Sequence, residues 1–195
     1  MDAHLTIVAA TSLEARAVRR ALPGATVFET GIALARRREG WGDTVVSCGL
    51  AGALRGDLPT GTVLVPVEVV RPDGTRVRCA DDLVAAYVAA ARSLGFEPVC
   101  DPMLTSAGIV RGAERAVWAR RGCAGVDMET GLLHASRLAA VRVVLDTPER
   151  ELHADWLHPA RALLDPRNWP EARWLARDAP RCARRAAEVV AAARH

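Results

Sequence analysis

The 195-residue sequence contains no lysine, since all 26 of its basic residues are arginines. This absence excludes every mechanism that needs a lysine side chain, such as the lysine of a phosphate-binding loop, Schiff-base catalysis or attachment of pyridoxal phosphate. The accompanying excess of alanine, arginine and valine is typical of GC-rich coding. The missing lysine therefore narrows the chemistry of the chain without indicating a function.

Long apolar runs, a basic leader and charge of a single sign are also missing. The longest unbroken apolar run covers residues 83–91, well short of the about 20 residues that cross a bilayer. The N-terminus shows no basic region followed by an apolar stretch, so we expect no secretory signal. Basic and acidic residues are interspersed along the chain, the net charge is only +3, and aromatic residues make up 4%. The sequence therefore shows no basic stripe of the kind that binds nucleic acid. We therefore expect a cytoplasmic protein with no integral membrane segment and no nucleic-acid partner.

The five cysteines are odd in number, and their spacings fit neither a C-x-x-C pair nor a zinc knuckle. Reduced thiols that act mostly as small core residues are the expected state in a cytoplasm. A catalytic thiol is the alternative. We predict no metal ligands and no cofactor.

Apolar periodicity predicts strands that alternate with helices along one domain covering residues 1–195. The strands are expected at residues 5–10, 44–48, 62–70 and 141–145, and a small-residue turn at residues 49–54. The helices are expected from Ser12 onward and at residues 81–94, 112–121, 129–138 and 171–193. This alternation is typical of a three-layer α/β domain with helices on both faces of a sheet.

Acidic residues follow several of these predicted strands. They are Glu14, the pair Asp127 and Glu129, and Asp146. Sites in α/β proteins gather outside the carboxyl ends of the strands, so a shared site beside Gly49 and Gly52 is expected. The alternative is that each carboxylate only caps a helix or faces solvent in a turn.

Four segments resemble the purine nucleoside phosphorylase and nucleosidase superfamily. They are residues 7–10 with Glu14, residues 47–52, residues 125–129 and residues 141–146. The Asp-Met-Glu run at 127–129, followed about 17 residues later by a strand that ends in Asp, is the most specific part. The resemblance covers nearly the whole chain and is nearest to the hopanoid-associated phosphorylase group. It implies a mixed central β-sheet flanked by helices.

The resemblance also implies roles for individual residues. Asp146 is similar to the family's general acid, which protonates N7 of a departing purine, and Glu129 to the carboxylate that binds the ribose hydroxyls. Met128 would lie against the ribose, although a core methionine is an equal alternative. Arg142 would orient Glu129 or Asp127. The base would be bound near residues 106–110, beginning at Ser106. Leu145 departs from the family, because many nucleosidases carry a serine there that supports the acid.

Glu14 bears on the choice between water and phosphate as the nucleophile. In the nucleosidase branch a glutamate at this position orients the attacking water, whereas phosphorolytic members place an arginine and a serine around the strand-end glycines. Here Leu50 stands where that serine would fall. Arg36, Arg37 and Arg38 could hold phosphate or could form a solvated surface. We therefore expect hydrolysis, with a phosphate-dependent phosphorylase as the alternative.

The resemblance makes a 5′-modified adenosine the expected substrate and a homodimer the expected assembly. Adenosylhopane is the most specific candidate, and methylthioadenosine, S-adenosylhomocysteine and futalosine are the other candidates. Trp156, Trp169 and Trp174 would line an apolar pocket for the 5′ group or would only seal the last helix. A non-catalytic nucleoside-binding module is the alternative from a different class.

Overall fold

The computed structural model describes residues 5–36, 39–157 and 159–193. Within these ranges one mixed sheet contains nine strands: β1 (Leu5–Ala9), β2 (Thr26–Glu29), β3 (Thr44–Ala53), β4 (Val63–Leu64), β5 (Glu68–Val70), β6 (Arg76–Arg78), β7 (Met103–Thr105), β8 (Gly125–Asp127) and β9 (Arg137–Asp146). The strand order is β2-β1-β3-β8-β7-β5-β6, and β9 pairs with both β3 and β4. Strands β1, β3 and β9 are parallel, so their carboxyl ends meet at one edge.

The helices are α1 (Ser12–Ala21), α2 (Asp81–Ser93), α3 (Ala113–Arg120), α4 (Pro159–Ala162) and α5 (Trp169–Ala192). Short 3-10 turns lie between them: η1 (Ile32–Leu34), η2 (Thr130–Leu132), η3 (Ala154–Leu157) and η4 (Pro166–Asn168). Among the described residues, no helix is both long enough and apolar enough to cross a bilayer.

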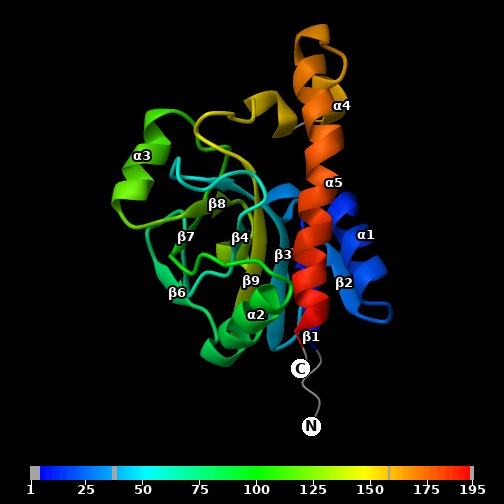
Figure 1. Cartoon of the computed structure of the whole chain (residues 1–195), viewed down its shortest axis with the longest axis vertical. Helices are drawn as coiled ribbons and strands as arrows, with labels where there is room; N and C mark the ends of the chain where they lie inside the picture. The colour runs from blue at the N-terminus through cyan, green and yellow to red at the C-terminus, as the bar shows by residue number, and fades with distance from the viewer. Residues whose placement is uncertain (1–4, 37–38, 158, 194–195) are drawn as a thin grey trace.

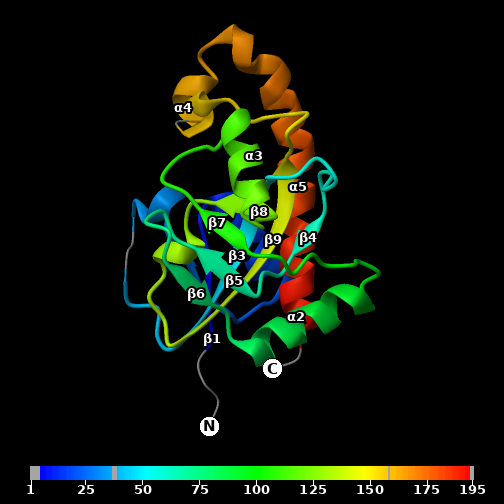
Figure 2. The ribbon, with the colours of Figure 1, turned by 90° about the vertical axis from the view of Figure 1, so that its left-hand side faces the viewer.

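Helices cover both faces of the sheet, as the alternation of side chains along the strands requires. Helix α5 packs on β3 and β9 and also contacts α1 and α2 on the same face (Figure 1). Leu104 and Val126 pack with Trp118 of α3 in a separate apolar cluster, whereas Met103, next to Leu104 on β7, belongs to the cluster that contains α5. Figure 2 shows α3 and α5 on different sides of the strands. The expected fold class, an α/β domain with a mixed sheet between helices, is confirmed.

Strand β3 is longer than the sequence indicated. Residues 49–53 continue the strand, where a small-residue turn was expected, because residues 49–52 pair with β9 as far as Asp146 and Ala53 pairs with Gly125 of β8. The register shifts between Ala51 and Gly52. The small residues thus serve to let neighbouring side chains approach the strand rather than to turn the chain.

The helix predicted for residues 129–138 is wrong. Only η2 forms there, and β9 already begins at Arg137. The Thr130 hydroxyl bonds to the Asp127 carboxylate, and the backbone amide of Gly131 donates to the Thr105 hydroxyl over 2.7 Å. The end of the expected helix belongs to the sheet instead, because Arg137 and Leu138 pair with Thr44 and Val45 of β3, and the Arg137 amide donates to the Asp43 carbonyl over 2.9 Å.

Candidate active site

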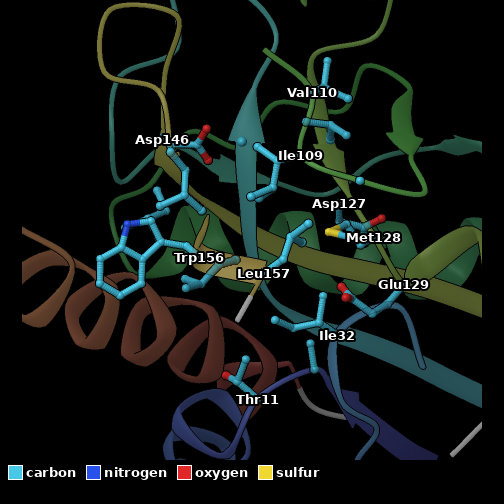
Figure 3. A pocket seen from close by; sticks show the side chains of 18 of the residues that line it. Thr11, Ile32, Ile109, Val110, Asp127, Met128, Glu129, Asp146, Trp156 and Leu157 are labelled. Carbon is cyan, nitrogen blue, oxygen red and sulfur yellow. The ribbon is translucent and has the colours of Figure 1, made fainter. Parts of the chain in front are cut away.

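A cavity of about 180 Å³ lies beyond the carboxyl ends of β1, β3 and β9 and beside the residues that follow β8. The four carboxylates predicted to share a site line it: Glu14, Asp127, Glu129 and Asp146. Figure 3 shows the last three. The remaining walls are mainly apolar and include Ile109, Val110 and Trp156. Segments that lie far apart in the sequence therefore converge on one cavity, at the sheet edge where α/β proteins place their sites.

Asp146 ends β9 and lies beside Arg115 of α3. The Arg115 Nη2 group bonds to the Asp146 carboxylate, and both side chains are buried. Burial raises the pKa of Asp146 above its usual value, although the Arg115 charge works in the opposite direction. Arg115 thus supplies the support that Leu145 cannot give to this carboxyl group.

Glu129 follows β8 and is almost fully buried. Its Oε1 accepts a hydrogen bond of 3.0 Å from the Ala33 amide, and its Oε2 lies 3.5 Å from Arg142 Nη2. Burial raises the pKa of Glu129 to about 7, because the nearby Arg142 compensates only in part. This carboxyl group can therefore change its charge near neutral pH.

Arg142 is paired mainly with Asp127, which was one of its two expected partners. Its Nη2 lies 2.7 Å from Asp127 Oδ2 and donates to the Ser47 hydroxyl over 2.5 Å. The Thr105 hydroxyl also donates to Asp127, over 2.6 Å. Arg142 is not among the residues that line the cavity. It lies beneath the cavity wall, where it can orient the carboxylates but does not face a ligand.

Glu14 is both a helix-capping residue and a residue of the cavity wall. The amide and hydroxyl of Thr11 each donate to its Oε2 over 2.7 Å, and the Leu50 amide donates to its Oε1 over 2.8 Å. Thr11 is the N-cap of α1, and it forms a capping box with Glu14. The two interpretations of Glu14, as a cap and as a site residue, are therefore compatible.

The two glycines of β3 leave room for the acids. A Cβ atom on Gly49 would overlap with Glu14 Oε1, and one on Gly52 would lie 2.9 Å from Asp146 Oδ1. Gly52 lines the cavity, whereas Gly49 lies behind Glu14 and is not among the lining residues. Glycine is therefore required here for close approach of the carboxylates.

Only the second half of the predicted base-binding segment, residues 106–110, lines the cavity. Gly108, Ile109 and Val110 line the cavity, whereas Ser106 does not; its hydroxyl bonds to the Gly108 carbonyl. Met128 lines the cavity, so it is not only a core residue.

Of the three tryptophans, only Trp156 lines the cavity. Trp174 is buried, with the Arg150 guanidinium 4.4 Å from its ring centroid, and Trp169 is exposed. Of the two interpretations, a pocket lined by tryptophan applies to Trp156 alone, and the buried Trp174 of α5 fits the sealing of the last helix.

The cysteines are all free thiols. Burial raises the pKa of the Cys48 thiol to about 12, although the charge of the nearby Arg142 works in the opposite direction. A thiol with this pKa stays protonated at neutral pH and is a poor nucleophile. Among the described residues, no group of His, Cys, Asp or Glu side chains has the arrangement of a metal site.

Sequence reasoning missed Arg115, and the sequence carries no signal for it. Four arginines occur between residues 111 and 121, and nothing in their spacing separates the buried one from the exposed ones. The ion pair with Asp146 joins residues 31 positions apart, so only the packing of α3 against β9 reveals it.

Comparison with known proteins gives matches only at the level of structure. No protein-family model and no curated protein sequence matches the chain. A mutant of Helicobacter pylori 5′-methylthioadenosine/S-adenosylhomocysteine nucleosidase with 5′-methylthioadenosine in its active site is similar with a TM-score of 0.70 and 14% identity, covering 97% of both chains. The Neisseria meningitidis 5′-methylthioadenosine/S-adenosylhomocysteine nucleosidase in complex with methylthio-immucillin-A is similar with a TM-score of 0.72 and 18% identity, covering 96% of both chains.

Futalosine hydrolase of Helicobacter pylori is similar over 96% of this chain and 95% of its own, with a TM-score of 0.68 and 14% identity. At these identities the likeness establishes the fold and leaves the activity open. The chain has the α/β fold of the nucleoside phosphorylase-like nucleosidases.

Proposed function

We propose that this protein is a nucleosidase that cleaves the N-glycosidic bond of a 5′-modified adenosine and releases adenine. One observation carries the proposal: two buried carboxyl groups, Asp146 with its raised pKa and Glu129 beside Arg142, face the same cavity (Figure 3). Breaking the bond between ribose and purine needs an acid at the base and negative charge near the sugar. The fold shared with known nucleosidases supports this assignment.

In this proposal Asp146 is the general acid. It donates its proton to N7 of the adenine while the bond between C1′ and N9 breaks, and the bonding electrons leave with the base. Burial favours the protonated carboxyl group that this step needs. The apolar wall of Ile109 and Val110 would contact the flat face of the base.

Glu129 is the proposed ligand of the ribose 2′- and 3′-hydroxyls. The Ala33 amide and Arg142 hold its carboxylate at the cavity wall. Its negative charge would stabilise the positive charge that develops on the sugar as the base departs. Met128 lies next to it and would contact the ribose.

Water is the proposed nucleophile. Glu14 would orient the water and accept its proton as the oxygen bonds to C1′, which yields the free sugar. Phosphate would need cationic partners, and the nearby candidates are occupied: Arg142 pairs with Asp127, and Arg36 with Glu29. Arg37 and Arg38 lie outside the described residues. A phosphate-dependent phosphorylase therefore remains the second candidate.

The 5′ substituent is proposed to occupy a second cavity. This cavity, of about 530 Å³, shares Ile32, Met128 and Leu157 with the first one. Its size and its largely apolar walls favour a bulky apolar 5′ group, and adenosylhopane is the most specific candidate. Methylthioadenosine, S-adenosylhomocysteine and futalosine are smaller alternatives.

Adenine release from these nucleosides tests the proposal. Purified protein is incubated with 5′-methylthioadenosine, S-adenosylhomocysteine, futalosine and adenosylhopane, and the free base is measured with and without phosphate. Base release without phosphate is expected. An absolute need for phosphate would overturn the role of Glu14. The absence of base from every nucleoside would favour the non-catalytic nucleoside-binding module, in which Glu14 only caps α1. The homodimer and the cytoplasmic location stay predictions.

A further inference from the structure

Arg115 is a buried guanidinium whose hydrogen-bonding groups are all directed at fixed partners. Besides Asp146, its Nε donates to the Val110 carbonyl over 3.1 Å, and its Nη1 donates to the Ala53 carbonyl. Only 2% of its side chain is exposed. A buried arginine in such surroundings is strongly destabilising when no carboxylate balances its charge.

A second carboxylate reaches the same guanidinium. Glu151 Oε1 lies 3.2 Å from Arg115 Nε and accepts a hydrogen bond of 2.5 Å from the Gly112 amide. Its Oε2 lies 3.5 Å from Arg111 Nε, and one fifth of the side chain is exposed. Arg115 therefore lies between Asp146 on the cavity side and Glu151 on the solvent side.

We propose that Glu151 is a positioning residue that balances the charge of Arg115 when Asp146 takes up a proton. This inference rests on the proposed function, because a general acid must be neutral before it reacts. With Asp146 protonated, Arg115 and Glu151 together carry no net charge. Without Glu151, protonation of Asp146 would leave a buried, unbalanced guanidinium, so the proton would be held less firmly.

The other charged groups around the cavity are carboxylates on the remaining walls. Glu14 lies on α1, Asp127 ends β8, and Glu129 lies two residues after the end of β8. Arg142 is taken up by Asp127. These groups are the same in wild type and variant. A change confined to Glu151 therefore isolates its contribution.

The decisive variant is Glu151→Gln, because glutamine can still accept the hydrogen bond from the Gly112 amide while the charge is lost. The pKa of Asp146 is measured by carboxyl ¹³C NMR, with Asp146→Asn to assign the signal. We expect the pKa of Asp146 to fall by about one pH unit, the lower end of the shift that one nearby charge causes. Glu149→Gln is the matched control, since Glu149 is an exposed residue two positions earlier, and it should leave the pKa unchanged.

An unchanged pKa of Asp146 in folded Glu151→Gln would overturn the proposal. Glu151→Ala removes the charge and the hydrogen bond together. If both variants lose their fold, as judged by circular dichroism, Glu151 is a structural tether and the proposal is wrong. Glu151→Asp keeps the charge and should restore the wild-type pKa.

The NMR measurement does not depend on turnover, so it separates this proposal from the proposed function. If the enzyme is active, the alkaline limb of its pH–rate profile should move to lower pH in Glu151→Gln by the same amount. If no nucleoside is cleaved but the pKa of Asp146 falls, the charge balance stands and the nucleosidase assignment fails.

Discussion

Asp146 and Glu129 are two buried carboxyl groups of one cavity, and each lies near a buried arginine. The arginine is used differently in the two places. Arg115 bonds directly to Asp146, whereas Arg142 lies 2.7 Å from Asp127 and only 3.5 Å from Glu129. Arg115 therefore pairs with the cavity acid Asp146 itself, whereas Arg142 pairs mainly with Asp127 and only weakly with the cavity acid Glu129.

This difference explains how two acids with raised pKa values can coexist. Asp127 compensates Arg142, so the pKa of Glu129 rises to about 7 because burial outweighs the remaining attraction. Asp146 keeps a raised pKa against a direct arginine contact, also because of its burial. Pairs of acids whose surroundings differ in this way are typical of catalytic sites.

The largest effect is expected from Asp146→Asn. The amide cannot donate an acidic proton to the leaving base, so the turnover number should fall by about 10²–10⁴-fold. Adenine release measures this change, and unfolding by urea checks that the protein remains folded. Asp101→Asn, at an exposed ion pair with Arg55, is the matched control. Wild-type turnover in Asp146→Asn would mean that the acid lies elsewhere.

Asp127→Asn removes the main carboxylate partner of Arg142, on the Glu129 side of the cavity. It leaves Arg142 without its nearest carboxylate, so the free energy of unfolding should fall by about 3–5 kcal/mol. Urea denaturation measures the loss. Asp101→Asn should cost less than about 1 kcal/mol, because Asp101 is exposed and its ion pair with Arg55 is in contact with solvent. The pKa of Glu129 should fall as Glu129 becomes the remaining partner of Arg142, and an unchanged pKa would contradict the comparison.

The raised pKa of Glu129 predicts a pH-dependent stability. Between the ordinary value of 4.5 and about 7, the folded protein holds a proton that the unfolded chain has released. The contribution of Glu129 to stability is therefore complete below about pH 4.5 and is lost as the pH rises through 7, by up to about 3 kcal/mol. Glu129→Gln removes this dependence. The stability difference between Glu129→Gln and wild type, measured at pH 5 and pH 8, should shift in favour of the variant at pH 8.

Substitution of the β3 glycines should lower stability by a smaller amount, and the size of the loss compares the Glu14 and Asp146 sides of the cavity. Gly49→Ala should displace the Glu14 carboxylate and Gly52→Ala should press on Asp146, each at a cost of about 1–3 kcal/mol in stability. The closer contact at Gly49 predicts the larger loss. Gly108→Ala is the control in the same cavity, since its Cβ would meet nothing within 4 Å. Equal losses at all three positions would show that the approach of the carboxylates is not the cause.

Much of the framework could be predicted from the sequence. Apolar runs marked β1, β9 and α2, and their regular alternation indicated the α/β class. Glu14, Glu129 and Asp146 were expected to share a site because they follow strands, and all three line the cavity. Local periodicity and strand-end position were sufficient for these inferences.

Other features depended on contacts between distant segments. Residues 49–54 read as a turn until residues 49–52 pair with β9, and residues 129–138 read as a helix until Arg137 and Leu138 pair with β3. The sequence by itself determined which segments are strands and helices and which acids stand at their ends, because those properties depend on neighbours along the chain. Only the tertiary structure decided that Arg115 joins Asp146 and that Arg142 favours Asp127, because a buried charge finds its partner through space.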